Sequence, residues 1–134
     1  MYSHDPQSKH PGQGDLFDGE LRAVLGRYGL VGRVRVLRED SHVAEPPPGE
    51  YALVLVDGDP SLAGTRADFE RFCRRLRPGG HALFHDAAPG GSRHETLAPL
   101  IDEIERDPAF GRRPDVGTLV HLSRSTTWPS TRAT

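Results

Sequence analysis

The most pronounced apolar run of this chain, Tyr51 to Val56, has no polar alternation and leads directly into Asp57. A short continuous apolar run bounded by turn residues is typical of a strand buried in a parallel sheet. The pattern predicts further strands as well: a stub at 2–4, an alternating strand at 33–37, and strands at 81–86 and 116–124. Each predicted strand except the last ends at or near an aspartate.

Between these strands, apolar residues recur at helical spacing. A first helix is predicted from Asp15 to Tyr28, where Gly29 would serve as the C-cap. A second helix is predicted to open at Thr65, with Asp68 completing a variant of the capping box. The inner stripe of the second helix consists of Phe69, Phe72, Cys73 and Leu76. An apolar stripe packs into a core, so the cysteine in it is predicted to be a core residue and not a nucleophile.

A third helix is predicted to be capped within 92–95 and to begin effectively near Pro99, since proline is best tolerated in a first turn. Its apolar positions are Leu97, Leu100, Ile101 and Ile104. Strands that alternate with amphipathic helices indicate βαβ units and an α/β fold with a parallel sheet. The length of 134 residues suits one domain, predicted over 1–124, followed by a flexible C-terminal tail at 125–134.

Composition and charge exclude several classes of function. A net charge of −2 gives no basic field, so no nucleic acid partner is expected. The single cysteine rules out an internal disulfide and fits a reducing environment, which predicts a cytoplasmic protein. No apolar run approaches the roughly 20 residues that cross a bilayer, so no membrane association is expected.

The candidate chemistry lies at the strand ends. In a parallel sheet the carboxyl ends of the strands face one edge, which would gather Asp5, Asp40, Asp57 and Asp86 there. If the strands ending in Asp57 and Asp86 are neighbours, their carboxylates can converge on one divalent cation such as Mg²⁺, with Ca²⁺ or Mn²⁺ as alternatives. Both aspartates could equally cap the turns that follow them.

Other polar residues allow a functional and a plain structural interpretation. Asp40 and Ser41 could bind an adenine amino group, although local evidence favours a simple turn. His85 could act as a base or a metal ligand. Strand alternation directs its side chain away from Phe84, which favours a packed or half-exposed histidine. The remaining histidines considered, His42, His94 and His121, show no paired spacing and are predicted to lie at the surface.

The segment "LVDGDPSLAGTRADFERFCRRLRPGGHALFHDA", residues 55–87, resembles the second half of class I S-adenosylmethionine-dependent methyltransferases. The order of "DG", "L.PGG" and "HD" is similar to the small-molecule O-methyltransferase branch. The resemblance implies a three-layer Rossmann-like fold with a mostly parallel sheet. It also implies methyl transfer from S-adenosylmethionine to a hydroxyl of a small-molecule acceptor, assisted by Mg²⁺ or another divalent cation.

The resemblance also implies roles for individual residues. Asp5 would bind the ribose hydroxyls of the cofactor, and Asp40 with Ser41 would flank its adenine. Asp57 and Asp86 match the metal-binding positions of metal-dependent members. Asp57 is also a candidate cofactor contact, and with His85 it is a candidate catalytic residue. A bound metal would orient the substrate hydroxyl and lower its pKa.

Two departures from the family pattern shape the expectation. Pro60 stands where members often have a histidine able to act as base. The first strand and glycine-rich loop of the family have no counterpart, which predicts a truncated chain, a rearranged sheet, or a homo-oligomer or partner chain that completes the sheet. Weak or absent activity is expected for these 134 residues alone.

Two rival interpretations remain at this point. The chain could be a non-catalytic remnant or interaction module of the same fold, which Pro60 and the missing strand would favour. The strand ending in Asp57 also resembles a phospho-receiver module. That fold needs a lysine at a later strand end, whereas the only lysine here, Lys9, precedes the strand.

Overall fold

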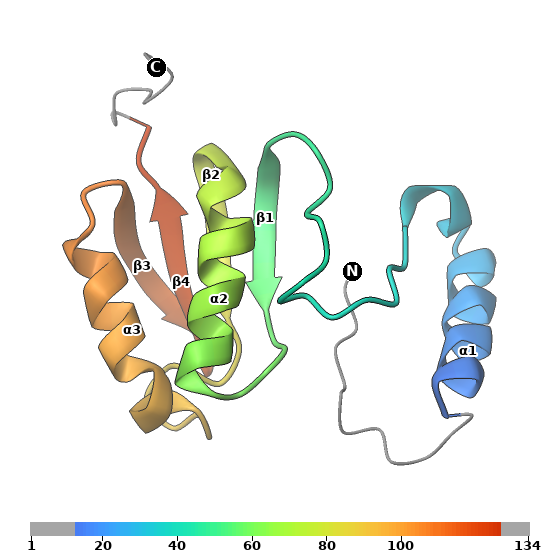
Figure 1. Cartoon of the computed structure of the whole chain (residues 1–134), viewed down its shortest axis with the longest axis horizontal. Coiled ribbons are helices and arrows are strands. Elements are labelled where there is room, and N and C mark those ends of the chain that lie inside the picture. The colour runs from blue at the N-terminus through green and yellow to red at the C-terminus, as the bar shows by residue number, and fades with distance from the viewer. Residues whose placement is uncertain (1–12, 127–134) are drawn as a thin grey trace. The chain divides into compact units, whose positions relative to one another are not determined.

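The computed structural model describes residues 13–126 (Figure 1). It divides into two compact units, Met1–Ala44 and Glu45–Thr134, and each is described here by itself. The boundary falls at the start of the proline-rich loop "EPPPGE". None of the helices in the described part of the chain is long and apolar enough to cross a membrane.

The first unit contains one α-helix, α1 (Gln13–Arg27), among its described residues. As predicted, Gly29 follows it with a positive φ of 68°, a conformation that suits a glycine C-cap. The strand predicted at 33–37 is wrong: a 3₁₀ turn, η1 (Val31–Arg33), takes its place, and only Leu37 makes a single β-bridge. Alternation favours extended backbone, but a strand forms only where a neighbour satisfies its N–H and C=O groups. The stub predicted at 2–4 lies outside the described residues.

The second unit is built on a four-stranded mixed sheet in the order β1-β2-β4-β3. Its strands are β1 (Tyr51–Val56), β2 (Leu76–Phe84), β3 (Phe110–Val116) and β4 (Leu119–Arg124). β1 and β2 are parallel, whereas β2 with β4 and β3 with β4 are antiparallel. The α/β class is therefore confirmed. The described sheet has one parallel and two antiparallel pairs, so it is mixed and not mostly parallel as predicted.

The single strand predicted at 116–124 is half of a hairpin whose other half, β3, the sequence pattern missed. The hairpin turns at Gly117, with φ 59°, as a tight connection between antiparallel strands requires. Pro114 falls inside β3, where proline is tolerated because β3 is an edge strand of the sheet. This proline obscured the strand signal.

Helix α2 (Leu62–Phe72) begins at a different cap from the one predicted. The N-cap is Ser61, whose Oγ accepts a hydrogen bond from the backbone N–H of Gly64 at 3.0 Å. The hydroxyl of Thr65 instead donates to the backbone carbonyls of Asp59 and Ser61, at 3.0 and 2.8 Å. Thr65 therefore lies inside the helix, because Ser61, four residues earlier, already caps a free backbone N–H of the first turn.

Helix α3 (His94–Arg106) also starts earlier than predicted. It begins at His94, so Pro99 lies inside the helix and not in its first turn. The cost of the proline is offset by packing: the apolar stripe predicted for this helix is buried, at Leu97, Leu100, Ile101 and Ile104.

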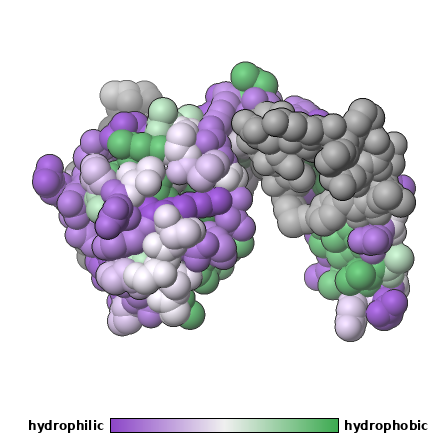
Figure 2. Space-filling model, turned by 90° about the horizontal axis from the view of Figure 1, so that it is seen from below, coloured by the Kyte–Doolittle hydropathy of each residue, from purple (hydrophilic) through white to green (hydrophobic). Residues whose placement is uncertain are grey.

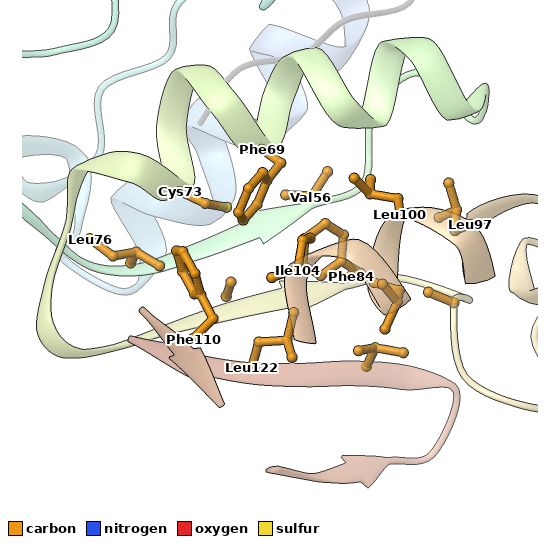
Figure 3. Close-up of a cluster of buried hydrophobic side chains, with 14 of the residues drawn as sticks. Val56, Phe69, Cys73, Leu76, Phe84, Leu97, Leu100, Ile104, Phe110 and Leu122 are labelled. Carbon is orange, nitrogen blue, oxygen red and sulfur yellow. The ribbon is translucent and has the colours of Figure 1, made fainter. Parts of the chain in front are cut away.

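One hydrophobic core holds the second unit together (Figure 3). Side chains from α2 and α3 meet alternate residues of the strands, among them Phe84 of β2 and Leu122 of β4, which are fully buried. Cys73 is also fully buried, and burial together with the charge of Asp68 raises the pKa of its thiol far above the usual range. The prediction that this cysteine is a core residue is confirmed.

Both α2 and α3 lie on the same face of the sheet (Figure 1). The opposite face carries the other alternating residues of the strands. On β1, Leu53 and Leu55 keep 54% and 52% of their surface exposed. The pairing Leu53↔His81 and Leu55↔Leu83 continues the same rows onto β2. Among the residues of this unit that the structure describes, no helix covers that face.

Candidate functional site

The candidate site lies where β1 and β2 end side by side. The two strands are parallel neighbours with Val56 paired to Phe84, so Asp57 and the His85–Asp86 pair leave the sheet together. The backbone N–H of His85 donates to the carbonyl of Val56 at 3.1 Å, which prolongs the pairing to this point. The condition on which the convergence of Asp57 and Asp86 depended, that their strands are neighbours, is therefore met. Figure 2 views the second unit from this edge, where hydrophilic residues dominate the surface.

The imidazole of His85 lies between the two carboxylates. Its Nδ1 is 3.2 Å from Oδ1 of Asp57 and 3.3 Å from Oδ2 of Asp86. Nδ1 itself is buried without a well-aligned hydrogen bond, while 43% of the side chain is exposed. The predicted half-exposed histidine is therefore observed. In the neutral tautomer with its hydrogen on Nδ1, that hydrogen faces both carboxylates and the lone pair is on Nε2.

Asp86 is held in an unusual backbone conformation with its carboxylate fixed. Its φ of 56° is the only positive φ among described residues other than glycine. The carboxylate accepts hydrogen bonds from the hydroxyls of Thr118, at 2.9 Å, and Ser92, at 3.3 Å. The Thr118 hydrogen bond is the main cause that lowers the pKa of Asp86, with His85, Ser92 and Arg93 adding to it. Asp86 is therefore ionised at neutral pH.

A guanidinium group also faces the acids. Nη2 of Arg93 lies 3.6 Å from Oδ1 of Asp57 and donates to the carbonyl of Gly58 at 3.4 Å. The backbone N–H of Arg93 donates to the carbonyl of Asp86 at 2.9 Å, which closes the loop between β2 and α3. In the sequence, residues 92–95 carry only the signal of a helix cap, and this arginine was missed. No local sequence signal marks it, because its side chain reaches Asp57 from the start of another element.

The expected metal site does not fit the side chains in this arrangement. Within residues 13–126, no group of three or more His, Cys, Asp and Glu side chains could hold a metal ion. Both oxygens of Asp86 already accept hydroxyl hydrogen bonds, and Arg93 brings a positive charge next to Asp57. The chemistry of this site is therefore assigned to its own side chains and not to a metal bound by Asp57 and Asp86.

The remaining predicted site residues lie elsewhere in the chain. In the first unit, Oδ1 of Asp40 accepts a hydrogen bond from the backbone N–H of His42 at 2.8 Å, as in the plain turn that local evidence favoured. Ser41 beside it is buried. The cofactor roles of Asp40 and Ser41 stay predictions, and Asp5 lies outside the described residues.

Comparison with known proteins identifies the family. A family model described as a methyltransferase domain matches residues 1–87, about two thirds of the chain. The chain belongs to this methyltransferase domain family. No curated protein sequence matches it.

Solved structures agree on the fold. The chain superposes on a protein from Clostridium thermocellum described as an rRNA methylase, with a TM-score of 0.59 and 13% identity over 79% of this chain and 68% of that one. A Staphylococcus aureus protein described as a caffeoyl-CoA O-methyltransferase gives 0.60 and 10%, over 81% and 59%. A Streptococcus mutans methyltransferase in complex with SAH (S-adenosylhomocysteine) gives 0.60 and 16%, over 92% and 74%.

At these identities the likeness concerns the fold alone. The predicted Rossmann-like methyltransferase fold is confirmed. The chain spans 59% to 74% of the length of these three solved proteins.

Proposed function

We propose that this domain transfers a methyl group from S-adenosylmethionine to a hydroxyl of a small molecule. The observation that carries the proposal is the imidazole of His85 held 3.2 and 3.3 Å from the carboxylates of Asp57 and Asp86. The group lies outside the carboxyl ends of two parallel strands, where open α/β sheets bind their ligands. Membership in a methyltransferase domain family supports the reaction class.

The residues present suit a cationic, hydroxyl-rich cofactor. The side chain of Asp57 is 46% exposed and offers carboxylate oxygens to hydroxyl groups or to a sulfonium charge. When bound, S-adenosylmethionine supplies an electrophilic methyl group on its sulfonium sulfur. Asp5 would bind the ribose hydroxyls, and Asp40 with Ser41 would contact the adenine.

The proposed catalytic role of His85 is that of a general base. With a proton on Nδ1 facing the carboxylates, Nε2 accepts the proton of the substrate hydroxyl as the oxygen attacks the methyl carbon. The carbon–sulfur bond breaks as the oxygen–carbon bond forms. The imidazolium that results is stabilised by Asp57 and Asp86, which also hold the ring in place. This role needs no histidine at Pro60.

We expect the 134-residue chain to bind the cofactor weakly, because the side chain of Asp57 is 46% exposed and water screens the contacts of its carboxylate. Ligand-observed saturation-transfer NMR with millimolar S-adenosylhomocysteine suits such weak binding. The expected result is saturation transfer from the protein to the adenosine protons of S-adenosylhomocysteine. Asp57→Asn should abolish this signal. Asp102→Asn, an exposed change on α3, serves as the matched control and leaves the signal unchanged.

Three outcomes separate the parts of this proposal. The assignment of the site is contradicted if the wild-type chain gives no saturation transfer, or if Asp57→Asn gives an equal signal. Micromolar affinity contradicts only the expected weakness. For the general base, S-adenosylhomocysteine release is measured with a panel of phenols and aliphatic alcohols. His85→Gln should lower the rate by about 10²–10⁴ at equal ligand binding.

A further inference from the structure

A second pair of polar side chains lies on the sheet face away from the helices. His81 of β2 and His121 of β4 approach so that Nδ1 of the first is 2.9 Å from Nε2 of the second. Their ring centroids are 5.0 Å apart. The register pairs His81 with Ser123 and Leu83 with His121, so the two imidazoles are diagonal neighbours on one face. The sequence spacing of His121 gave no sign of this partner on another strand.

The two imidazoles can each offer a metal ion a lone pair. In the structure their facing nitrogens, 2.9 Å apart, share one hydrogen, with one nitrogen donating and the other accepting. A metal ion takes the place of this hydrogen when the donor ring carries it on its other ring nitrogen, so that both facing nitrogens have a lone pair. Burial lowers the pKa of His121, and the charges of His81 and Arg113 lower it further. The imidazole of His121 is therefore predominantly neutral near pH 7, and neutral imidazole is the ligating form.

We propose that His81 and His121 form a bidentate site for a divalent transition metal of tetragonal or octahedral preference, Ni²⁺ or Cu²⁺. Metal–imidazole bonds of about 2.05 Å at a right angle put the two nitrogens about 2.9 Å apart, whereas a tetrahedral centre would need about 3.3 Å. The nitrogens stand at 2.9 Å in the structure. Water completes the coordination.

This site differs from the candidate site at Asp57 and Asp86 in the residues that form it. No carboxylate stands opposite either histidine in the described register, where the neighbours are Leu53, Leu83, Ser123 and Arg113. Such a pair has only two protein ligands, in agreement with the lack of any larger metal-binding group within residues 13–126.

A nearby cation sets the sign of a sharp test. Arg113 pairs with His121 in the register, and its Nε donates to Oγ of Ser123 at 3.0 Å. Its positive charge opposes a bound metal ion. Removal of this charge by Arg113→Gln is therefore expected to tighten metal binding, which a merely adventitious ion elsewhere on the chain would not show.

The experiment measures metal binding to the full chain at pH 7.5. Calorimetry with Ni²⁺ and electron paramagnetic resonance with Cu²⁺ should report one site with two imidazole nitrogens. His81→Gln or His121→Gln should weaken binding by at least about tenfold, since the second ligand is lost from a high effective concentration. Arg113→Gln should strengthen it, and Zn²⁺ should bind more weakly than Ni²⁺. A His42→Gln control should bind as the wild type does.

Several results would overturn the proposal. One is binding that survives the double variant His81→Gln/His121→Gln, and another is binding that disappears in a His4→Gln/His10→Gln chain. Circular dichroism melting curves of each variant show whether it is folded. A folded double variant that still binds Ni²⁺ as the wild type does excludes the site.

Discussion

The two faces of the sheet in the second unit are made by the same strands and differ in almost every other respect. On the helix-covered face, Phe84 and Leu122 are fully buried, whereas Leu53 and Leu55 on the other face keep more than half of their surface exposed. Alternation along each strand sends neighbouring residues to opposite sides. One face therefore supplies the packing of this unit, while the other bears half-exposed leucines and the paired histidines.

The largest expected effect on stability comes from truncating a leucine on the helix-covered face, with a leucine on the other face as the comparison. Leu122→Ala should lower the free energy of unfolding by about 2–5 kcal/mol, because it opens a cavity in a closed core. Leu55→Ala should cost less than about 1 kcal/mol, because half of its side chain is already in water. Urea denaturation followed by circular dichroism measures both.

The same pair of variants can break the comparison. If Leu55→Ala costs as much as Leu122→Ala, the second face is covered in solution. A dependence of the Leu55→Ala cost on protein concentration would identify association between copies of the chain as the cover.

The next effect concerns the loop that joins the helix-covered face to the candidate site. A Cβ on Gly91 would lie 2.3 Å from the backbone oxygen of Asp86, so Gly91→Ala must displace the backbone that holds this carboxylate. The expected cost is about 1–3 kcal/mol, as for other overpacked sites. Gly111→Ala on the edge strand β3 is the matched control, since a Cβ there meets nothing within 4 Å.

The readout for Gly91→Ala is twofold. Denaturation gives the stability of the variant. Ligand-observed NMR shows whether saturation transfer to S-adenosylhomocysteine falls together with the stability. A cost no larger than that of Gly111→Ala would mean that the loop adapts freely, which would contradict the tight approach of Gly91 to Asp86.

A smaller effect on stability is expected from Arg74, a charged residue that packs against the edge of the core on the helix-covered face. Arg74 lies 4.9 Å from the ring centroid of Phe69, and its guanidinium donates to Asp107 at 2.6 Å. Arg74→Ala should cost about 1–2 kcal/mol, since it loses a cation–π contact and a partly exposed ion pair. Arg66→Ala, which breaks the exposed pair with Glu103, should cost less than about 1 kcal/mol.

The pH dependence of this edge has a defined sign. The hydrogen bond from Arg74 is the main cause that lowers the pKa of Asp107, and the backbone N–H of Ala109 adds to it. Stability from Asp107 is therefore present above the ordinary carboxyl pKa and is lost as the pH falls through its lowered value. Asp107→Asn should flatten stability between pH 5 and pH 2 relative to the wild type. Equal slopes would contradict this assignment.

Burial was predictable from the sequence where one periodicity decided it. The inner stripe with Phe69 and Cys73 lies where the pattern put it, because spacing alone fixes the face of a helix. The apolar run before Asp57 forms the predicted strand, but its predicted burial is wrong at Leu53 and Leu55, because no helix among the described residues covers that face. The neighbourhood of Asp57 and Asp86 was also predictable, because the two parallel strands that precede them are adjacent in the sheet.

Partners across the sheet were not predictable in the same way. The pairing of His81 with His121 depends on the order and register of β2 and β4, which no local spacing encodes. Arg93 was missed because its side chain crosses from the start of α3 to the end of β1. Periodicity reports how a residue is buried, whereas the chemistry of a site depends on which strands become neighbours.

The smallest effect returns to the second face. Burial, His81 and Arg113 hold the pKa of His121 below its ordinary value. The unfolded chain therefore binds more protons than the folded one between the lowered and the ordinary pKa, so stability falls as the pH falls through this window. His121→Gln should reduce the loss of stability between pH 7.5 and pH 5.5, measured by urea denaturation against the wild type. The other titrating groups are the same in both chains. Parallel curves of stability against pH would therefore show that the pair His81 and His121 contributes nothing to the pH dependence of folding.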